Sequence, residues 1–207
     1  MTQVSDRLAS LSPSATLAMS QKSGELKAQG IDVINLSVGE PDFNTPDFIK
    51  EAAKKAIDDN FSRYSPVAGY PALRNAIVAK LKNENGLEYT KQSVCNTVMV
   101  LVNPGDEVII PAPFWVSYSE MVKLAEGTPV IVPAGIEQDF KITPAQLEAA
   151  ITPKTKALIL CSPSNPTGSV YSAEELAGLA EVLKKHPDII VIADEIYEHI
   201  NYIGKHN

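Results

Sequence analysis

Apolar residues in the first half of the chain recur every three or four positions, which is the spacing of one face of an α-helix. One helix is predicted to open at Thr45-Pro46, because threonine caps helices and proline suits the first helical position. A second is predicted to continue over residues 73–81 and to end at Asn85-Gly86, where both residues tolerate a positive φ. The apolar positions of the first helix are Phe48, Ile49, Ala52, Ala53 and Ile57.

The second half of the chain alternates short apolar runs with helical patterns. Residues 172–175 (SAEE) form a capping box and predict a helix between the third and fourth runs. The last run has no polar alternation and therefore predicts a central parallel strand covered on both faces. Together these patterns predict an α/β fold with three layers, a mostly parallel sheet flanked by helices. The four runs are residues 107–111, 128–132, 156–161 and 189–193.

The composition narrows the class of ligand. The chain has 207 residues, 44% of them hydrophobic, and a net charge of −7. Such a chain has no basic stripe for nucleic acid or an anionic membrane, so small-molecule partners are favoured. Its apolar stretches are too short to span a bilayer and its N-terminus lacks a signal pattern, so a cytoplasmic location is expected. Cys95 and Cys161 stand in no disulfide or metal-binding pattern, so we expect buried free thiols and no metal site.

Polar residues follow two of the predicted strands directly. One strand is followed by SPSNPTG at residues 162–168, and the next by Asp194-Glu195-Ile196-Tyr197. Ligands of parallel sheets bind beyond the carboxyl ends of the strands, so Asn165, Asp194 and Tyr197 are expected to project toward one spot.

Each of these three residues also has a purely structural interpretation. Taken singly, Asp194 is typical of a helix cap, Asn165 of a turn and Tyr197 of a core aromatic. Taken together, an acid, an amide and a phenol match a heteroaromatic cofactor, which has a ring nitrogen to keep protonated and a phenolic oxygen to hold. We therefore interpret them as one binding site.

Five motifs follow one another along nearly the whole chain: VGEPDFNTP, RYSPVAGYPALR, PGDEVIIPAPFWVSY, SPSNPTG and ADEIYEH. They resemble those of the class I aminotransferases, pyridoxal-phosphate enzymes of the aspartate aminotransferase fold. Their amino-acid sequences are most similar to those of the aspartate/prephenate aminotransferase branch. The resemblance implies a transaminase that moves an amino group between aspartate or glutamate and a 2-oxo acid. It also implies an N-terminal arm and helix over residues 1–38 and an incomplete large cofactor-binding domain over residues 39–207.

The resemblance assigns roles to individual residues at the cofactor ring. Asp194 resembles the aspartate that pairs with the pyridine nitrogen and makes the ring an electron sink. Asn165 and Tyr197 resemble the pair that bonds the phenolic oxygen. Trp115 resembles the aromatic residue that stacks on the ring, although it is also a plausible core anchor. In relatives, cis bonds at Asn165–Pro166 and Ala112–Pro113 accompany this arrangement, so both are expected here.

Two further roles concern the substrate and the assembly. The resemblance places the backbone of Gly39, together with Asn165, at the substrate carboxylate. It places Tyr64 at the cofactor phosphate of a second subunit, which implies a homodimer with shared sites.

The chain departs from the family pattern in two places. Thr90 runs directly into Lys91, without the strand and small-residue turn that cradle the cofactor phosphate in relatives. The 207 residues also end before the lysine that bonds the cofactor and before the C-terminal domain of relatives. No catalytic residue is therefore assigned, and weak non-covalent cofactor binding without amino exchange is expected.

Other interpretations of the sequence stay open. The chain is alternatively a non-catalytic aminotransferase-like remnant or an interaction subunit. Other enzymes of the same fold, such as lyases acting at the β or γ carbon, are a further alternative, since specificity in relatives depends partly on residues that this chain lacks. A cofactor-sensing transcription regulator would need a basic DNA-binding module, which residues 1–30 do not offer. Because the family domain is incomplete, uncovered apolar faces and self-association are expected.

Overall fold

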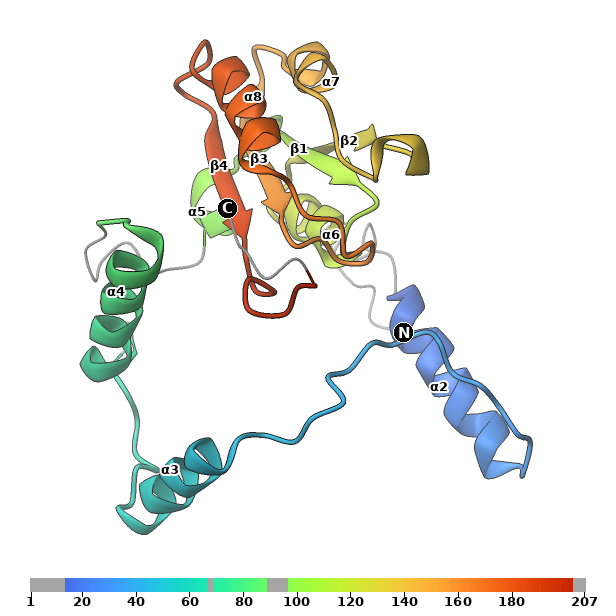
Figure 1. The fold of residues 1–207 in the computed structure, drawn as a ribbon, viewed down its shortest axis with the longest axis vertical. Helices are drawn as coiled ribbons and strands as arrows, with labels where there is room; N and C mark the ends of the chain where they lie inside the picture. Colours follow the sequence, from blue (N-terminus) through green and yellow to red (C-terminus); the bar gives the residue numbers. More distant parts are fainter. Residues whose placement is uncertain (1–13, 67–68, 89–96, 203–207) are drawn as a thin grey trace, which may run out of the picture. The chain divides into compact units, whose positions relative to one another are not determined.

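The computed structural model describes residues 14–66, 69–88 and 97–202. The chain forms two compact units (Figure 1). The first, Ala15–Asn96, is called the helical unit below. The second, which we call the sheet unit, is made mainly of Thr97–Asn207.

The helical unit contains three helices among its described residues: α2 (Ala15–Ala28), α3 (Asp47–Asp58) and α4 (Pro71–Asn85). Helix α4 ends at Gly86, which has a φ of 68°, as the sequence predicted. Helix α3 begins one residue later than predicted. Pro46 is the N-cap rather than the first helical residue, because its ψ of 142° is extended and its carbonyl is the first acceptor, bonded by the amide of Lys50 at 3.2 Å.

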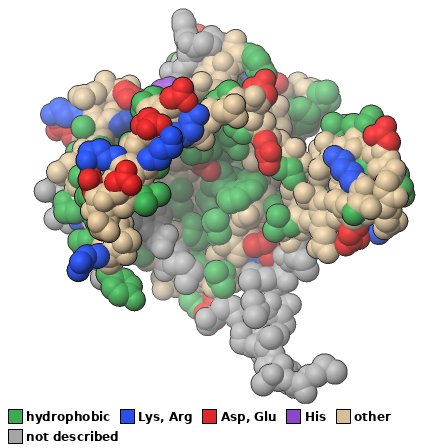
Figure 2. Space-filling model, turned by 90° about the horizontal axis from the view of Figure 1, so that it is seen from below, with side chains coloured by type: hydrophobic (Ala, Val, Ile, Leu, Met, Phe, Trp, Pro, Cys, Tyr) green, Lys and Arg blue, Asp and Glu red, His purple; other side chains and the backbone are tan. Residues whose placement is uncertain are grey.

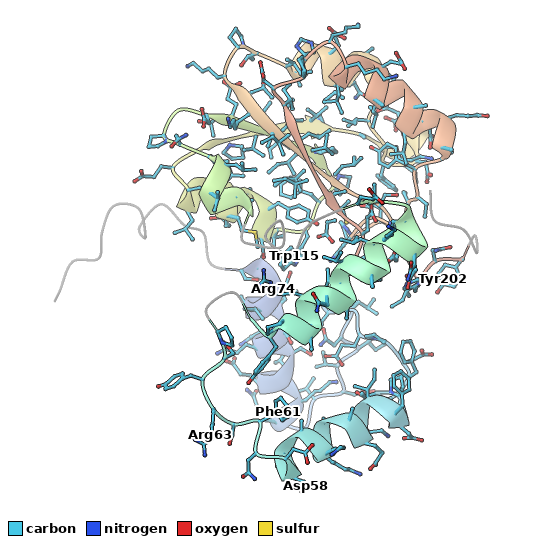
Figure 3. The ribbon with its side chains drawn as sticks, turned by 90° about the vertical axis from the view of Figure 1, so that its left-hand side faces the viewer. Asp58, Phe61, Arg63, Arg74, Trp115 and Tyr202 are labelled. Carbon is cyan, nitrogen blue, oxygen red and sulfur yellow. The ribbon has the colours of Figure 1, made fainter. Side chains whose placement is uncertain are left out.

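The apolar face of α3 is predicted correctly but is not covered within the described residues. No residue of α3 or α4 is buried, and Phe48 and Ile57 are about three-quarters exposed at 75% and 76%. One aromatic contact joins the segments between these helices, an edge-to-face pair of Phe61 and Tyr70 with ring centroids 5.9 Å apart. Phe61 is labelled in Figure 3, and hydrophobic side chains are visible at the surface in Figure 2.

The sheet unit confirms the predicted α/β class. The four strands among its described residues are all parallel and lie in the order β2-β1-β3-β4. The strands are β1 (Glu107–Ala112), β2 (Thr128–Pro133), β3 (Thr155–Cys161) and β4 (Ile190–Asp194). Around them lie α5 (Thr97–Leu101), α6 (Ser117–Leu124), the 3-10 turn η1 (Ile136–Gln138), α7 (Pro144–Ala150) and α8 (Ala173–Leu183).

Two apolar clusters, one for each face of the sheet, hold these layers together. Alternate residues of a strand point to opposite faces, so Ile109 and Leu158 pack with residues of α7 and α8, whereas Val108 and Ile159 pack with residues of α5 and α6. Figure 1 shows the helices on the two sides of the strands. The three-layer arrangement is therefore confirmed.

The capping box predicted for α8 is present. The Ser172 hydroxyl accepts from the Glu175 amide at 3.2 Å, and the Glu175 carboxylate accepts from the Ser172 amide at 2.7 Å. Helix α7 has a second capping box, Thr143 with Gln146, which the sequence analysis did not identify. Both helices thus have fixed starting points against the sheet.

The predicted position of the last strand is wrong. The run at 189–193 was expected to form a central strand covered on both faces, but β4 is an edge strand of the described sheet and pairs only with β3. Its residues Ile190 and Val191 are 36% and 44% exposed. An apolar run favours a strand, but its place in the sheet depends on pairing partners that the run itself does not encode.

In the part of the chain that the structure describes, every helix is too short or too polar to cross a membrane.

Candidate functional site

The site lies where β1, β3 and β4 end. In the parallel register Cys161 is paired with Asp194, the last residue of β4, and the amide of Ser162 extends this ladder with a 3.2 Å bond to the Asp194 carbonyl. The segments that follow the strands therefore emerge at the same edge of the sheet.

Asn165 lies in a turn that its own backbone closes. The Ser164 amide bonds the Ser169 carbonyl at 2.9 Å and the Gly168 amide bonds the Ser164 carbonyl at 2.8 Å. Gly168 has a φ of 73°, a conformation that residues with a Cβ rarely adopt. This closed turn, residues 162–168, is called the Asn165 turn below.

The structure brings Asn165 and Tyr197 together, as the sequence predicted. The side-chain nitrogen of Asn165 donates to the Tyr197 hydroxyl over 3.3 Å, although 32 residues separate the two. An amide nitrogen carries two hydrogens, so one remains for a ligand, and the Tyr197 oxygen that accepts here keeps its own hydrogen to donate. Two donors are thus presented side by side.

Asp194 is held by two donors. The Tyr118 hydroxyl donates a hydrogen bond to Oδ2, and the backbone amide of Ile196 donates to Oδ1 at 3.3 Å. Burial, with further contributions from its hydrogen bonds to Asp194 and Cys161, raises the pKa of Tyr118 far above its ordinary value. Tyr118 therefore stays a neutral donor, and the carboxylate it serves is fixed in orientation.

Trp115 completes the cluster from the loop between β1 and α6. Its ring meets that of Tyr118 edge to face, with centroids 5.6 Å apart and planes at 87°. Trp115 is 41% exposed, so one surface of the indole remains open to a ligand. Figure 3 places Trp115 at the end of the sheet unit where the strands finish.

Tyr118 is the functional residue that the sequence analysis missed. It stands in the motif PGDEVIIPAPFWVSY, to which the resemblance assigns a role only at Trp115. The available signal is its position three residues after Trp115, in the first turn of α6. That position does not predict the contact with Asp194, which is 76 residues away in the sequence.

The predicted cis bonds at Asn165–Pro166 and Ala112–Pro113 are present. Ser162–Pro163 is also cis, which the sequence analysis did not predict.

Cys161 confirms part of the thiol prediction. It is a free, partly buried cysteine whose sulfur lies 3.3 Å from the Pro163 carbonyl, and burial raises its pKa. Cys95 and the Thr90-Lys91 junction lie outside the described residues.

Two predicted site residues belong to the other unit. Gly39 and Tyr64 lie in the helical unit, and the Tyr64 side chain is fully exposed. Their roles toward the substrate and the cofactor phosphate stay predictions.

A small cavity lies beside the cluster, lined among others by Phe114, Tyr118, Lys141 and Ser169. Its volume of about 20 Å³ has room for one water molecule and not for an aromatic ring. Trp115, Asn165 and Asp194 are not among the residues that line this cavity.

The geometry is accompanied by a match to a known family. The family model for aminotransferase class I and II matches residues 31–205. The chain belongs to this family. That match runs through both units and includes all six residues assigned to the site.

Individual relatives agree with this membership. The chain is 55% identical over 214 residues to a probable aspartate/prephenate aminotransferase of Rickettsia bellii, covering 99% of this chain and 54% of that protein. It is 54% identical to the aspartate/prephenate aminotransferase of Cereibacter sphaeroides, covering 97% and 52%. The chain therefore spans about half the length of the curated relatives it matches.

Solved structures support the same fold. The aspartate aminotransferase from Thermus thermophilus with maleate matches with a TM-score of 0.92 at 44% identity, covering 100% of this chain and 56% of that one. The aspartate aminotransferase from Rhizobium meliloti matches with a TM-score of 0.90 at 41% identity, covering 98% and 53%.

Proposed function

We propose that this chain supplies the ring-binding part of a pyridoxal-phosphate-dependent transaminase, which moves an amino group between aspartate or glutamate and a 2-oxo acid. One observation carries the proposal. Asp194, the Asn165–Tyr197 pair and Trp115 all lie at the carboxyl ends of the parallel strands. Family membership and the names of the relatives, which specify aspartate and prephenate, support the choice of substrates.

The donor set fits the cofactor ring chemically. Asp194 offers a carboxylate whose two oxygens are oriented by Tyr118 and by the Ile196 amide, and a carboxylate is the partner that a protonated ring nitrogen needs. When bound, the cofactor supplies a ring that accepts electrons as the α-proton of the substrate leaves. The task of Asp194 is to hold the proton on the ring nitrogen.

Asn165 and Tyr197 suit a hydrogen-bond acceptor of the cofactor, whereas Asp194 suits a donor. Both present hydrogen-bond donors, which suit the phenolic oxygen of the cofactor, and their mutual bond of 3.3 Å keeps the two donors in one orientation. Trp115 offers an exposed indole face for stacking, which contributes binding through apolar and dispersion contacts. These residues bind and orient the ring, and none of them is assigned the transfer of the substrate proton.

The remaining assignments are proposals of the same kind. Gly39, with Asn165, binds the substrate carboxylate, and Tyr64 reaches the cofactor phosphate of a second subunit in a homodimer. Residues 1–38 form an arm and helix, and residues 39–207 form part of the large cofactor-binding domain. The protein works in the cytoplasm, in amino acid biosynthesis.

A non-catalytic interaction subunit is the second candidate. It is favoured by the exposed edge strand β4 and by the uncovered apolar face of α3, because edges and apolar patches of this kind commonly receive another polypeptide. The two candidates differ in whether the site at the carboxyl ends of the strands binds the cofactor.

Equilibrium dialysis with pyridoxal phosphate separates the candidates. The chain is expected to bind one cofactor weakly, and Asn165→Ala with Tyr197→Phe is expected to lower the affinity by roughly tenfold or more, because two donors are removed. Thr128→Ala, at the exposed first residue of β2, serves as the control. Equal binding by all three proteins would contradict the proposed site.

Reduction with borohydride and mapping by mass spectrometry tests the covalent chemistry of the same sample. Scattered, substoichiometric adducts and no glutamate-dependent formation of a keto acid are expected. A stoichiometric adduct on one lysine, with exchange lost on its replacement, would show that this chain carries a complete transaminase site.

A further inference from the structure

The Asn165 turn is followed by a short segment, residues 169–171, that connects it to α8. We call this segment the return limb. Its Ser169 and Tyr171 side chains are 8% and 3% exposed, so the limb is embedded in the protein. The Ser164–Ser169 backbone bond of 2.9 Å links it directly to the residue before Asn165. A shift of the return limb therefore shifts Asn165.

The return limb is tied to a distant segment, residues 139–142, which follows η1. The Ser169 hydroxyl donates to Asp139 at 3.2 Å, and the amide of Ile142 donates to the Tyr171 hydroxyl at 2.9 Å. The Lys141 ammonium bonds the Val170 carbonyl at 3.4 Å. All three residues of the limb are thus fixed by one segment about 30 residues earlier.

Lys141 is the centre of this connection. Its ammonium lies 3.1 Å from Asp139 and 2.9 Å from Glu175, and its side chain is only 15% exposed. Burial by itself lowers the pKa of Lys141, but the hydrogen bonds to Glu175 and Asp139 outweigh it and raise the pKa above the ordinary value. Lys141 therefore stays charged and joins Asp139 to the first turn of α8.

The backbone before Lys141 adopts a conformation that is unfavourable for its residues. Asp139 and Phe140 have φ angles of 50° and 56°, in the left-handed region that residues with a Cβ seldom occupy. Such residues persist where surrounding contacts determine the backbone, and they are frequent beside functional sites. The contacts here are the bonds of residues 139–142 to the return limb and to α8.

We infer that Asp139 and Lys141 are positioning residues that hold the Asn165 turn in register with Tyr197. Neither residue is assigned to the cofactor or the substrate. The inference rests on the proposed function only for the role of Asn165 toward the cofactor, since the linkage itself is a property of the chain alone.

Hydrogen exchange of the chain without cofactor tests the linkage. Lys141→Met keeps the apolar stem and removes the charge, so the Ser164 and Gly168 amides are expected to exchange roughly tenfold faster. Lys141→Arg is expected to restore slow exchange. Lys185→Met is the matched control, because Lys185 also forms a long-range ion pair, 2.8 Å from Glu148, away from the Asn165 turn.

The Asn165 side chain provides a second measurement. Its amide signal in a ¹⁵N spectrum, assigned by its loss in Asn165→Asp, is expected to shift in Lys141→Met and to return in Lys141→Arg. If Lys141→Met does not fold, Asp139→Gly replaces it, because glycine accepts the positive φ while the carboxylate is lost. The same faster exchange at Ser164 and Gly168 is expected.

Two results would overturn the inference. One is unchanged exchange at Ser164 and Gly168 with an unmoved Asn165 signal in a folded variant. The other is an equal acceleration throughout β1 and β3, which would mark Lys141 as a general stabiliser of the unit. A parallel cofactor titration of the unaltered chain reports separately on the proposed function, since its failure leaves the exchange result intact.

Discussion

The sheet unit and the helical unit have similarly clear hydrophobic patterns and very different burial. In the sheet unit, Val108, Ile109 and Leu158 are completely buried. In the helical unit, α3 has a well-defined apolar face, yet none of its residues is buried. The comparison teaches that an amphipathic pattern specifies a helix and the side it would bury, whereas burial itself depends on a surface that the described helical unit does not provide.

The largest expected difference between the units lies in their apolar side chains. Leu158→Ala in the sheet unit is expected to lower the free energy of unfolding by about 2–5 kcal/mol, because it opens a cavity in a packed core. Leu73→Ala, at a leucine of α4 that is 60% exposed, is expected to change it by about 0.5 kcal/mol or less. Urea unfolding followed by far-ultraviolet circular dichroism, to which the helices of both units contribute, measures both changes. Equal effects would break the comparison.

The next effect concerns association. The exposed apolar face of α3 is expected to drive self-association of the chain, and Ile57→Glu is expected to reduce it, because it places a charge on that face. Light scattering over a range of concentrations gives the mass. Lys54→Glu, on the polar part of the same helix, is the control for the added charge. A monodisperse monomer of the unaltered chain would contradict this prediction.

The smallest effect distinguishes long-range from local ion pairs. Glu175 of the sheet unit bonds Lys141 across 34 residues, whereas Glu51 of the helical unit bonds Lys54 within one helical turn. Burial raises the pKa of Glu175, but the Ser172 amide and Lys141 outweigh it, so its folded pKa lies below the ordinary 4.5. A lowered folded pKa gives stability that is present above pH 4.5 and is lost as the pH falls through the folded pKa.

The midpoints of urea unfolding between pH 6 and pH 3 test whether stability is lost as the pH falls. The midpoint of the unaltered chain is expected to fall over this range, and Glu175→Gln is expected to flatten part of the decline. Glu51→Gln is expected to leave the profile unchanged, since local exposed pairs contribute little. Identical profiles for the two variants would remove this distinction between the units.

The sequence predicted those features whose signals are local. The capping box at Ser172, the end of α4 at Gly86 and the four strands depend on neighbouring residues, and the structure has them all. The edge position of β4 was not predictable in this way, because it depends on which strands are available to pair with it.

The candidate site likewise contains contacts that the sequence predicts and contacts that depend on how the elements pack. Asn165 and Tyr197 could be paired in advance because each follows a parallel strand, and such strands end at one edge of the sheet. Tyr118 could not be paired with Asp194, because their contact depends on where α6 packs across the sheet. The ties of Lys141 to the return limb were missed for the same reason.

The central claim is that the sheet unit binds the cofactor ring at the carboxyl ends of its strands, through Asp194 and Trp115. The most direct test is titration of the chain with pyridoxal phosphate, followed by the fluorescence of Trp115. Saturable quenching is predicted, with an affinity roughly tenfold or more lower in Asp194→Asn, which removes the charge that pairs with the ring nitrogen. Asp188→Asn, at an exposed aspartate before β4, is predicted to bind as the unaltered chain does. Quenching that is absent, or equal in Asp194→Asn, would contradict the account.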